Sequence, residues 1–271
     1  MNNEMLRELK KYLVIYWMFI KNSLMSQMEY RVNFIISACV QLAHMGIKLT
    51  YVIVLYNVGI NINGFSPDEM MIMIGTYSAL SGVFVSFFLI NFGSLSGHIK
   101  NGSLDTIIVK PISLQFMVTL RHVDLAFAIV SLAVGGTMVG IGWYRADVDF
   151  TIVNVIGYIG FTLWGLFLTY SVFLIPNIIS FWTVSAGGIS QFVNQLWDFN
   201  NMPMTIYNGI FKIIGTFVIP VFLITNIGGL FILDKLSPLM IVWSLIAPIL
   251  FFILCRMLWK KAMKHYVSVS G

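Results

Sequence analysis

The chain has 271 residues, of which 58% are hydrophobic and 10% are charged, and its formal net charge is +5. Soluble domains carry about 25% charged residues, so this composition excludes an ordinary soluble fold and favours a membrane protein. The hydrophobic runs are continuous and do not alternate with polar residues, which excludes a transmembrane β-barrel and predicts an all-α polytopic membrane protein. The positive charges cluster beside these runs, so nucleic acid is not expected as a partner.

The first predicted element is an amphipathic helix over residues 4–22. Charged residues such as Glu8 and Lys11 surround apolar ones such as Leu13 and Trp17. The apolar part is too short and too closely flanked by charge to cross a bilayer. The pattern therefore predicts an N-terminal helix that lies in the membrane interface.

Six hydrophobic runs follow, and each is long enough to cross a bilayer. The predicted spans are residues 32–58, 70–92, 116–143, 152–183, 210–233 and 240–258. Pro220 lies inside the fifth span, and the polar but aromatic stretch 185–209 before it is predicted at an interface. We expect one transmembrane domain over residues 1–271, with six transmembrane helices.

Six spans place both termini on the same side, and the distribution of Lys and Arg predicts which side it is. Two of these residues, Arg145 and Lys235, lie in loops on the opposite side. Thirteen lie in the segments on the side of the termini: Arg7, Lys10, Lys11, Lys21, Arg31, Lys100, Lys110, Arg121, Lys212, Arg256, Lys260, Lys261 and Lys264. The asymmetry predicts that both termini and the loop at residues 96–113 are cytoplasmic.

The loop at residues 96–113 is the longest polar interruption between the first spans. Leu104, Ile107 and Ile108 stand at positions i, i+3 and i+4, so a helix would place them on one face. A short amphipathic helix in a cytoplasmic loop suits docking on another protein. The alternative is a loop that lies on the lipid headgroups.

His44 and Lys48 are four residues apart inside the first span. One interpretation is that they line a translocation path, and the other is that Lys48 extends towards the outer interface. Apart from Asp124 near the entry of the third span, no acidic residue lies in the predicted spans, which argues against a proton-coupled carrier. The energy for transport would have to come from another protein.

The chain carries no pattern typical of an enzyme. It lacks the phosphate-binding Gly-x-x-x-x-Gly-Lys-Ser/Thr motif, because the dipeptide Gly-Lys does not occur. The four histidines have no metal-ligand spacing, and Cys39 and Cys255 are isolated in apolar runs. We expect no catalytic residue, bound cofactor or metal, and we interpret His122 and Asp124 as an interface pair. Arg121 and Asp124 are expected to pair on one face of the third span.

Three motifs resemble the six-span bacterial permeases of the ABC-2 type exporters. The first is Ile99-Lys100-x-Gly102-x-Leu104-Asp105-x-x-Ile108-x-Lys110-Pro111, which is similar to the loop after the second span. The second is Ser180-Phe181-Trp182-Thr183 followed by Trp197-x-Phe199-x-x-x-Pro203-x-x-Ile206-Tyr207. The third is the tail Trp259-Lys260-Lys261-Ala-Met-Lys264-His265-Tyr266-x-Ser268, from which Val267 and Val269 depart slightly.

The resemblance implies a permease subunit that exports an amphipathic substrate (a drug, a peptide antibiotic or a lipid-like molecule) across a bacterial inner membrane. It implies two partners, namely a second permease subunit, identical or sister, and cytoplasmic ATPase subunits that use the ATP. The residues expected to couple to the ATPase are Lys100, Gly102, Leu104, Asp105, Ile107, Ile108, Lys110 and Pro111. Leu104, Ile107 and Ile108 would fill an apolar groove on the ATPase, and Pro111 would end the docking helix. The alternatives are a non-transporting sensor or assembly factor that recruits a partner through the same loop, and an ion-driven carrier.

Overall fold

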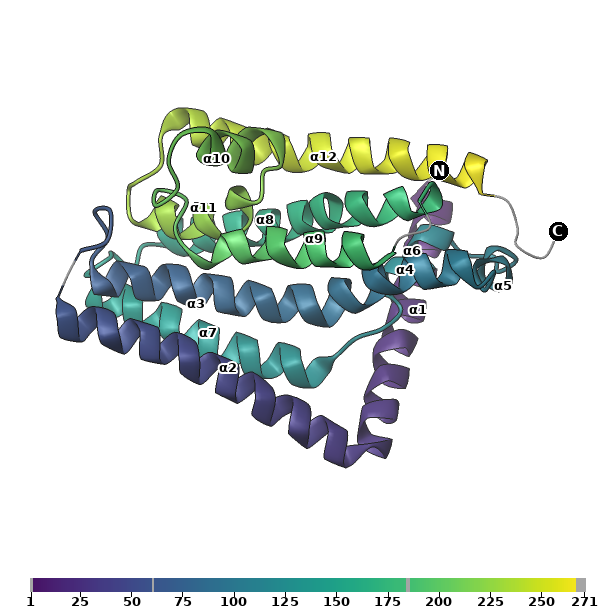
Figure 1. Cartoon of the computed structure of the whole chain (residues 1–271), viewed down its shortest axis with the longest axis horizontal. Coiled ribbons are helices and arrows are strands. Elements are labelled where there is room, and N and C mark those ends of the chain that lie inside the picture. Colours follow the sequence, from purple (N-terminus) through teal and green to yellow (C-terminus); the bar gives the residue numbers. More distant parts are fainter. Residues whose placement is uncertain (1, 60, 184–185, 267–271) are drawn as a thin grey trace.

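The computed structural model describes residues 2–59, 61–183 and 186–266, and they form a helical bundle (Figure 1). The expectations for Ser185 and for Val267, Ser268 and Val269 lie outside the described residues. In chain order the elements are α1 (Asn2–Glu29), α2 (Arg31–Val58), α3 (Pro67–Val83), η1 (Phe84–Leu89), α4 (Ile90–Lys100), α5 (Leu104–Ile108), α6 (Leu114–Leu120), α7 (Leu125–Arg145), α8 (Ile152–Ile178), η2 (Ile179–Phe181), α9 (Ala186–Asp198), η3 (Phe199–Asn201), α10 (Gly209–Ile213), η4 (Ile214–Val218), α11 (Phe222–Ile232) and α12 (Pro238–His265).

Five helical segments are long and apolar enough to cross a bilayer. They are α2, the continuous segment from α3 through η1 to α4, α7, α8 with η2, and α12. In Figure 1 these helices run along the long axis of the molecule, whereas α1 lies across one end. The predicted all-α polytopic fold is confirmed.

The bundle has two different ends. The loop end holds the connections 61–66, 146–151 and 233–237, and two ion pairs join the end of α7 and the connection 233–237 to the start of α3. Arg145 Nε lies 2.9 Å from Asp68 Oδ1, and Lys235 Nζ lies 2.7 Å from Glu69 Oε2. The opposite end, which we call the α5 end, carries α5, α1 and the last turns of α12 (Figure 1).

The prediction of a fifth span over 210–233 is wrong. The segment consists of two helical pieces, Gly209–Val218 and Phe222–Ile232, bent by 97°. Asn63 Nδ2 donates to Thr205 O at 3.2 Å, and Lys235 Nζ donates to Gly64 O at 2.8 Å. Both flanks of the pair therefore meet the connection 61–66. The pair enters and leaves at the loop end, and the bend between its two pieces lies at Pro220, which has no N–H to continue a helix.

The chain crosses the bundle a fifth time through α9 instead. Before α9, the Trp182 ring lies 6.0 Å from the His265 ring at the α5 end, and after η3 the chain reaches Thr205 at the loop end. The sixteen residues of α9 and η3 cover about 24 Å at the helical rise. The prediction that 185–209 lies at an interface is wrong, because its apolar residues Val193, Leu196 and Trp197 share one buried helix face. Among the described residues, α9 therefore joins the two ends of the bundle beside the five long apolar segments, in place of the predicted fifth span.

The third predicted span, 116–143, begins too early. α6 ends at Leu120, and α7 begins at Leu125 after a break. Asp124 caps α7, because its Oδ1 accepts a hydrogen bond from Phe127 N at 3.2 Å. Arg121 therefore belongs to the end of α6, and the expected pairing of Arg121 with Asp124 on one helix face is wrong.

α3 is the centre of the core. Twelve of its seventeen residues are buried, against four of the twenty-eight in α2. Its closest partner is α7, where glycines replace side chains at the contact. A Cβ on Gly135 would lie 2.6 Å from Ala79 N, so the two backbones approach as closely as only glycine permits. α3 and α7 thus form one tightly packed pair.

Candidate functional site

α5 is a single short helix that projects from the α5 end between α4 and α6 (Figure 1). The turn before it depends on Gly102, whose φ of +67° is accessible to glycine at little cost. His98 and Ser103 brace this turn, since His98 Nδ1 and Ser103 Oγ are 2.8 Å apart. The helix ends at Ile108, before Pro111, so the expected role of Pro111 as its terminator is wrong.

Leu104 and Ile107 face the interior of the chain. Leu104 is 0% exposed and Ile107 is 4% exposed, and both belong to the main hydrophobic core. The prediction that they fill a groove on a partner is wrong for this structure, because the chain itself covers them. They anchor α5 to the bundle.

The large apolar side chains that a partner can reach here are Ile108 at the end of α5 and Val109 after it, which are 42% and 82% exposed. Lys100, Lys110 and Pro111 are exposed beside them. On the other side, Tyr266 Oη donates to Asp105 Oδ1 at 3.0 Å. Burial and this hydrogen bond raise the pKa of the Tyr266 hydroxyl. The α5 surface, defined here as Thr106 and Ile108–Pro111, is therefore an exposed apolar and basic patch on an anchored helix.

A second site is a groove of about 600 Å³ between α2, α3 with η1, and α9. His44 and Lys48, the two residues predicted from α2, both line it. Lys48 does not extend away from the bundle, since its Nζ lies 3.9 Å from the centre of the Tyr77 ring. The structure thus brings both predicted pathway residues to one groove.

Asp198 also lines this groove, and sequence reasoning placed it at an interface. The available signal was the spacing of Gln191, Asn194, Gln195 and Asp198, which repeats at i, i+3, i+4 and i+7. Such a polar stripe on a helix with an apolar opposite face is typical of a span that lines a cavity. A carboxylate therefore lies on the fifth crossing, in contrast to the expectation of spans without acidic residues.

Trp197 forms the wall of the groove. Its ring stacks on Phe84 with 4.1 Å between centroids, and its Nε1 donates to Ser81 Oγ at 3.1 Å. Tyr77 stacks on the same indole with 6.0 Å between centroids. These contacts hold α9 against α3 and η1 and keep the polar stripe turned towards the open side.

His122 and Asp124 do not form the expected pair. Asp124 caps α7, whereas the backbone N–H of His122 donates to Asn91 Oδ1 at 2.9 Å. Burial, and then the nearby charges of Arg121 and His98, lower the pKa of the His122 imidazole. Within the described ranges, no three His, Cys, Asp or Glu side chains are placed to hold a metal ion.

Comparison with known proteins gives one match. A family model described as ABC-2 family transporter protein matches residues 42–270, which is most of the chain. Neither the curated proteins nor the solved structures contain a match to this chain.

Proposed function

The chain belongs to the ABC-2 family of transporter proteins, and from that premise we propose that it is a permease subunit driven by a separate ATPase. Membrane components of this family are not themselves catalytic, so ATP binding and hydrolysis fall to the partner. Two ATPase subunits would dock on the α5 surface of two permease subunits. The substrate would be amphipathic and would be exported.

The distribution of charge supports a cytoplasmic α5 end. Lys212 lies on α10 near the loop end, so the predicted count of Lys and Arg changes from thirteen against two to twelve against three. The side with more Lys and Arg is the cytoplasmic side. Both termini and α5 would then face the cytoplasm of a bacterium, where an ATPase is available.

The observation that carries the proposal is the combination of anchoring and exposure in α5. Leu104 and Ile107 lock the helix into the core, and Asp105 ties it to the end of α12. A force applied at Ile108 and Val109 would therefore move α4, α6 and α12 together as a rigid body. A loosely attached loop could not transmit such a force.

The groove with His44, Lys48 and Asp198 is our candidate for the pathway lining. Most of α2 is exposed along it, and many of the exposed residues are apolar. A second permease subunit, identical or sister, placed against α2 and α9 would close the groove into a shared path. A path that combines aromatic walls with a cation and a carboxylate suits an amphipathic substrate.

A docking test compares two substitutions at equally exposed residues. Val109→Asp places a charge on the α5 surface, and Tyr144→Asp places one at the loop end, where Tyr144 is 83% exposed. We expect Val109→Asp to reduce co-purification of the ATPase encoded beside this chain at least tenfold, and Tyr144→Asp to leave it unchanged. Equal co-purification with both variants would remove the docking role of α5.

Transport itself is tested in sealed vesicles that contain the chain and its ATPase. ATP-dependent movement of a fluorescent amphipathic dye, lost with Val109→Asp, would support the permease. Movement driven by a proton or sodium gradient without ATP would favour a carrier. ATPase recruitment without movement of any of a panel of amphipathic compounds would favour a sensor or assembly factor.

A further inference from the structure

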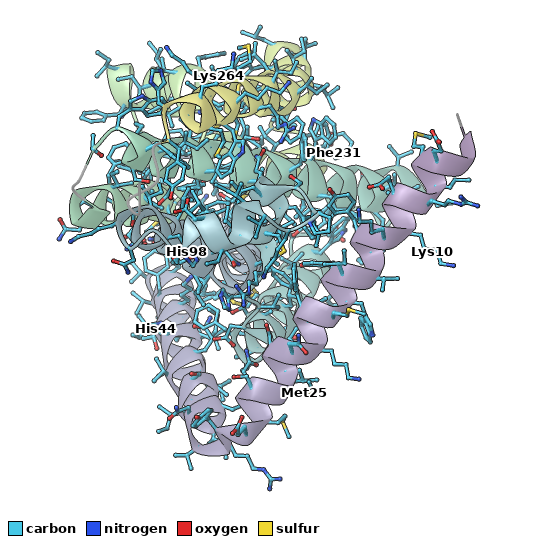
Figure 2. The ribbon with its side chains drawn as sticks, turned by 90° about the vertical axis from the view of Figure 1, so that its right-hand side faces the viewer. Lys10, Met25, His44, His98, Phe231 and Lys264 are labelled. Atoms are coloured by element: carbon cyan, nitrogen blue, oxygen red, sulfur yellow. The ribbon has the colours of Figure 1, made fainter. Side chains whose placement is uncertain are left out.

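One face of α1 changes its chemistry along the helix. The residues that point at the bundle are Leu9, Tyr12, Leu13, Tyr16 and Phe19 in the first part, and Asn22, Ser23, Ser26 and Gln27 in the second. They recur at the three- and four-residue spacing of a single helix face. Figure 2 shows α1 crossing the end of the bundle with Lys10 directed away from it. Two adjacent cavities lie between this face and the bundle.

The cavity beside the first part of α1 is apolar and has a volume of about 440 Å³. Val83, Phe87, Phe88, Phe116 and Leu166 line it from the bundle. This size falls within the roughly 300–1,000 Å³ typical of small-molecule pockets. A cavity with such walls at membrane depth would take up hydrocarbon in preference to water.

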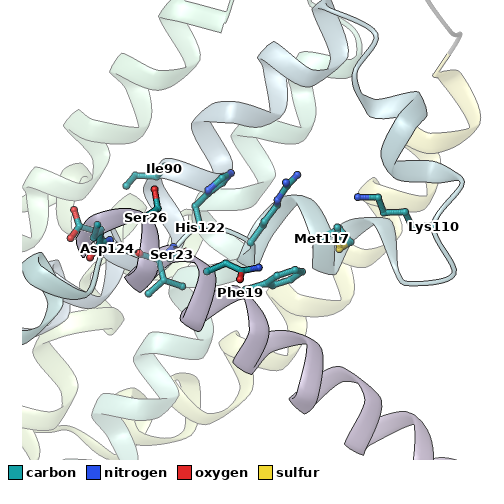
Figure 3. A pocket seen from close by; sticks show the side chains of 12 residues that line it. Phe19, Ser23, Ser26, Ile90, Lys110, Met117, His122 and Asp124 are labelled. Carbon is teal, nitrogen blue, oxygen red and sulfur yellow. Dashed lines mark hydrogen bonds between the residues drawn. The ribbon is translucent and has the colours of Figure 1, made fainter. Parts of the chain in front are cut away.

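The cavity beside the second part of α1 is polar and has a volume of about 480 Å³. Figure 3 shows Ser23 and Ser26 on α1 on one side and Met117, His122 and Lys110 from the α5–α7 segment on the other. Lys110 and Arg121 supply two cations, and Asp124 is the one acidic residue of the lining. The carboxylate of Asp124 is engaged in capping α7, so the cavity favours an anion.

The polar cavity also contains an acceptor that lacks a donor. Gln27 Nε2 donates to Val123 O at 2.8 Å, which fixes the amide on the backbone of the segment before α7. Gln27 Oε1 is buried and accepts no hydrogen bond from any described residue. A buried carbonyl without a donor is costly, so a small shift of the atoms around Oε1 that lets a ligand hydroxyl donate to it would be favourable.

Phe116, which lines the apolar cavity, lies beside Phe19, which lines the polar one. Its ring lies 5.9 Å from the Phe19 ring and 4.9 Å from the Tyr12 ring, centroid to centroid. A ligand that fills both cavities needs an anionic head with a hydroxyl group for the polar cavity and a hydrocarbon tail for the apolar one. The head and the tail must join close to each other, because the two cavities are adjacent. This is the chemistry of a phospholipid.

We propose that the junction of α1, α6 and the 121–124 segment binds one anionic phospholipid with a hydroxylated headgroup, such as phosphatidylglycerol. Its phosphate lies between Lys110 and Arg121, and one acyl chain lies under α1 against Phe116. The lipid fills the space between the interfacial helix and the bundle and so joins α1 to the transmembrane core. The inference requires that the chain lies in a membrane, and it holds whether or not the chain transports anything.

Photocrosslinking in a defined bilayer tests the proposal. The full-length chain with p-benzoylphenylalanine in place of Phe116 is placed in nanodiscs of equal parts phosphatidylglycerol and phosphatidylethanolamine. After illumination, mass spectrometry identifies the adducts. We expect adducts enriched at least threefold in phosphatidylglycerol, whereas the same probe at Ile156, an exposed residue of α8, gives the bulk ratio.

Two double variants distinguish a specific lipid site from a general attraction of anionic lipids to positive charge. Lys110→Gln with Arg121→Gln should reduce the enrichment at position 116 to the bulk ratio. Lys21→Gln with Lys10→Gln, which removes two exposed cations of α1 outside the lining, should leave it unchanged. All variants are compared at matched helicity and elution volume.

Three outcomes would overturn the proposal. They are adducts at the bulk lipid ratio, the same enrichment after the loss of Lys110 and Arg121, and crosslinks mainly to protein. The last outcome would assign the cavity to a polypeptide partner. The result is independent of the transport assays, so failure of one proposal leaves the other standing.

Discussion

Two sides of the bundle are built in opposite ways. On one side α3 and α7 are in backbone contact through Gly75 and Gly135, and α3 has hardly any exposed surface. On the other side α2 is mostly exposed, and a groove of about 600 Å³ separates it from α9. Two charged residues of the bundle, Lys48 and Asp198, lie on the open side.

The contrast separates the part of the chain that keeps its shape from the part that meets a ligand or another subunit. Close packing leaves little room for change, so α3 and α7 have to move as one body. The open side still lacks a packing partner in a single chain. In the proposed permease, α5 would drive the rigid pair, and the substrate would contact the open side.

The largest effect is expected where the packing is tightest. A Cβ at position 135 would lie 2.6 Å from Ala79 N and 2.7 Å from Gly75 O, and backbone atoms cannot turn aside as side chains do. Gly135→Val should therefore lower the unfolding free energy by about 3 kcal/mol or more. Denaturant unfolding in micelles measures the change.

The neighbouring glycine provides the control. No atom of another helix lies within 4 Å of a Cβ at position 136, so Gly136→Val should change stability by less than about 1 kcal/mol. If the two variants are equally stable, α3 and α7 are not in the contact that distinguishes this side of the bundle.

An effect of similar size is expected at the residue that attaches the open side to the rigid one. Trp197 is buried and stacks on both Phe84 and Tyr77. Trp197→Ala should cost about 3–5 kcal/mol, as is usual for a buried aromatic residue, and should release α9. Trp182→Ala, at a half-exposed indole, should cost much less. Protease accessibility around residue 200 measures the release of α9, and unchanged cleavage would show that other contacts hold this helix.

Hydrophobicity predicted the fold class and the spans formed by α2, α7, α8 and α12, because these segments are apolar over a full bilayer thickness. It failed at α9 and at the α10–α11 pair, because hydropathy reports how apolar a segment is and not its path through the bundle. α9 buries one face and exposes a polar one to the groove, so its mean hydropathy is low although it crosses the bundle. The 210–233 segment is apolar over most of its length, yet it does not cross: α11 is buried in the bundle, whereas α10 has no buried residue.

The candidate site shows a similar limit. The i, i+3, i+4 pattern correctly indicated that Leu104 and Ile107 share an apolar face, but it could not indicate whether that face meets a partner or the chain itself. The groove depends on α9 lying beside Lys48, so the contribution of Asp198 required the tertiary structure. His44 and Lys48 were found because polar residues in a span are rare and costly.

An intermediate effect is expected for the charges of the groove. Lys48→Gln and Asp198→Asn keep the size of the side chains and remove the charge, and both residues lie on the open side. We expect ATP-dependent efflux to fall several-fold, with a change in stability below about 1 kcal/mol. If the two charges act together, the fold-decrease in efflux of the double variant should be smaller than the product of the two single fold-decreases. Loss of folded protein in either single variant would place these charges in the rigid part instead.

The smallest effect is expected at the polar contact between the two sides, where Gln41 Nε2 of α2 donates to Ser131 Oγ of α7 at 2.6 Å. Gln41→Leu removes this hydrogen bond, which is worth about 0.6 kcal/mol in a membrane bundle. It also removes Gln41 Oε1, which is buried and has no donor among the described residues, so the two changes nearly cancel. Ser131→Ala deletes the same hydrogen bond but leaves the Gln41 amide buried without an acceptor, which should cost about 1–3 kcal/mol. Thermal unfolding of the two variants in the same detergent makes the comparison. A larger loss of stability for Gln41→Leu than for Ser131→Ala would mean that this contact holds α2 to α7 firmly, although most of α2 is exposed.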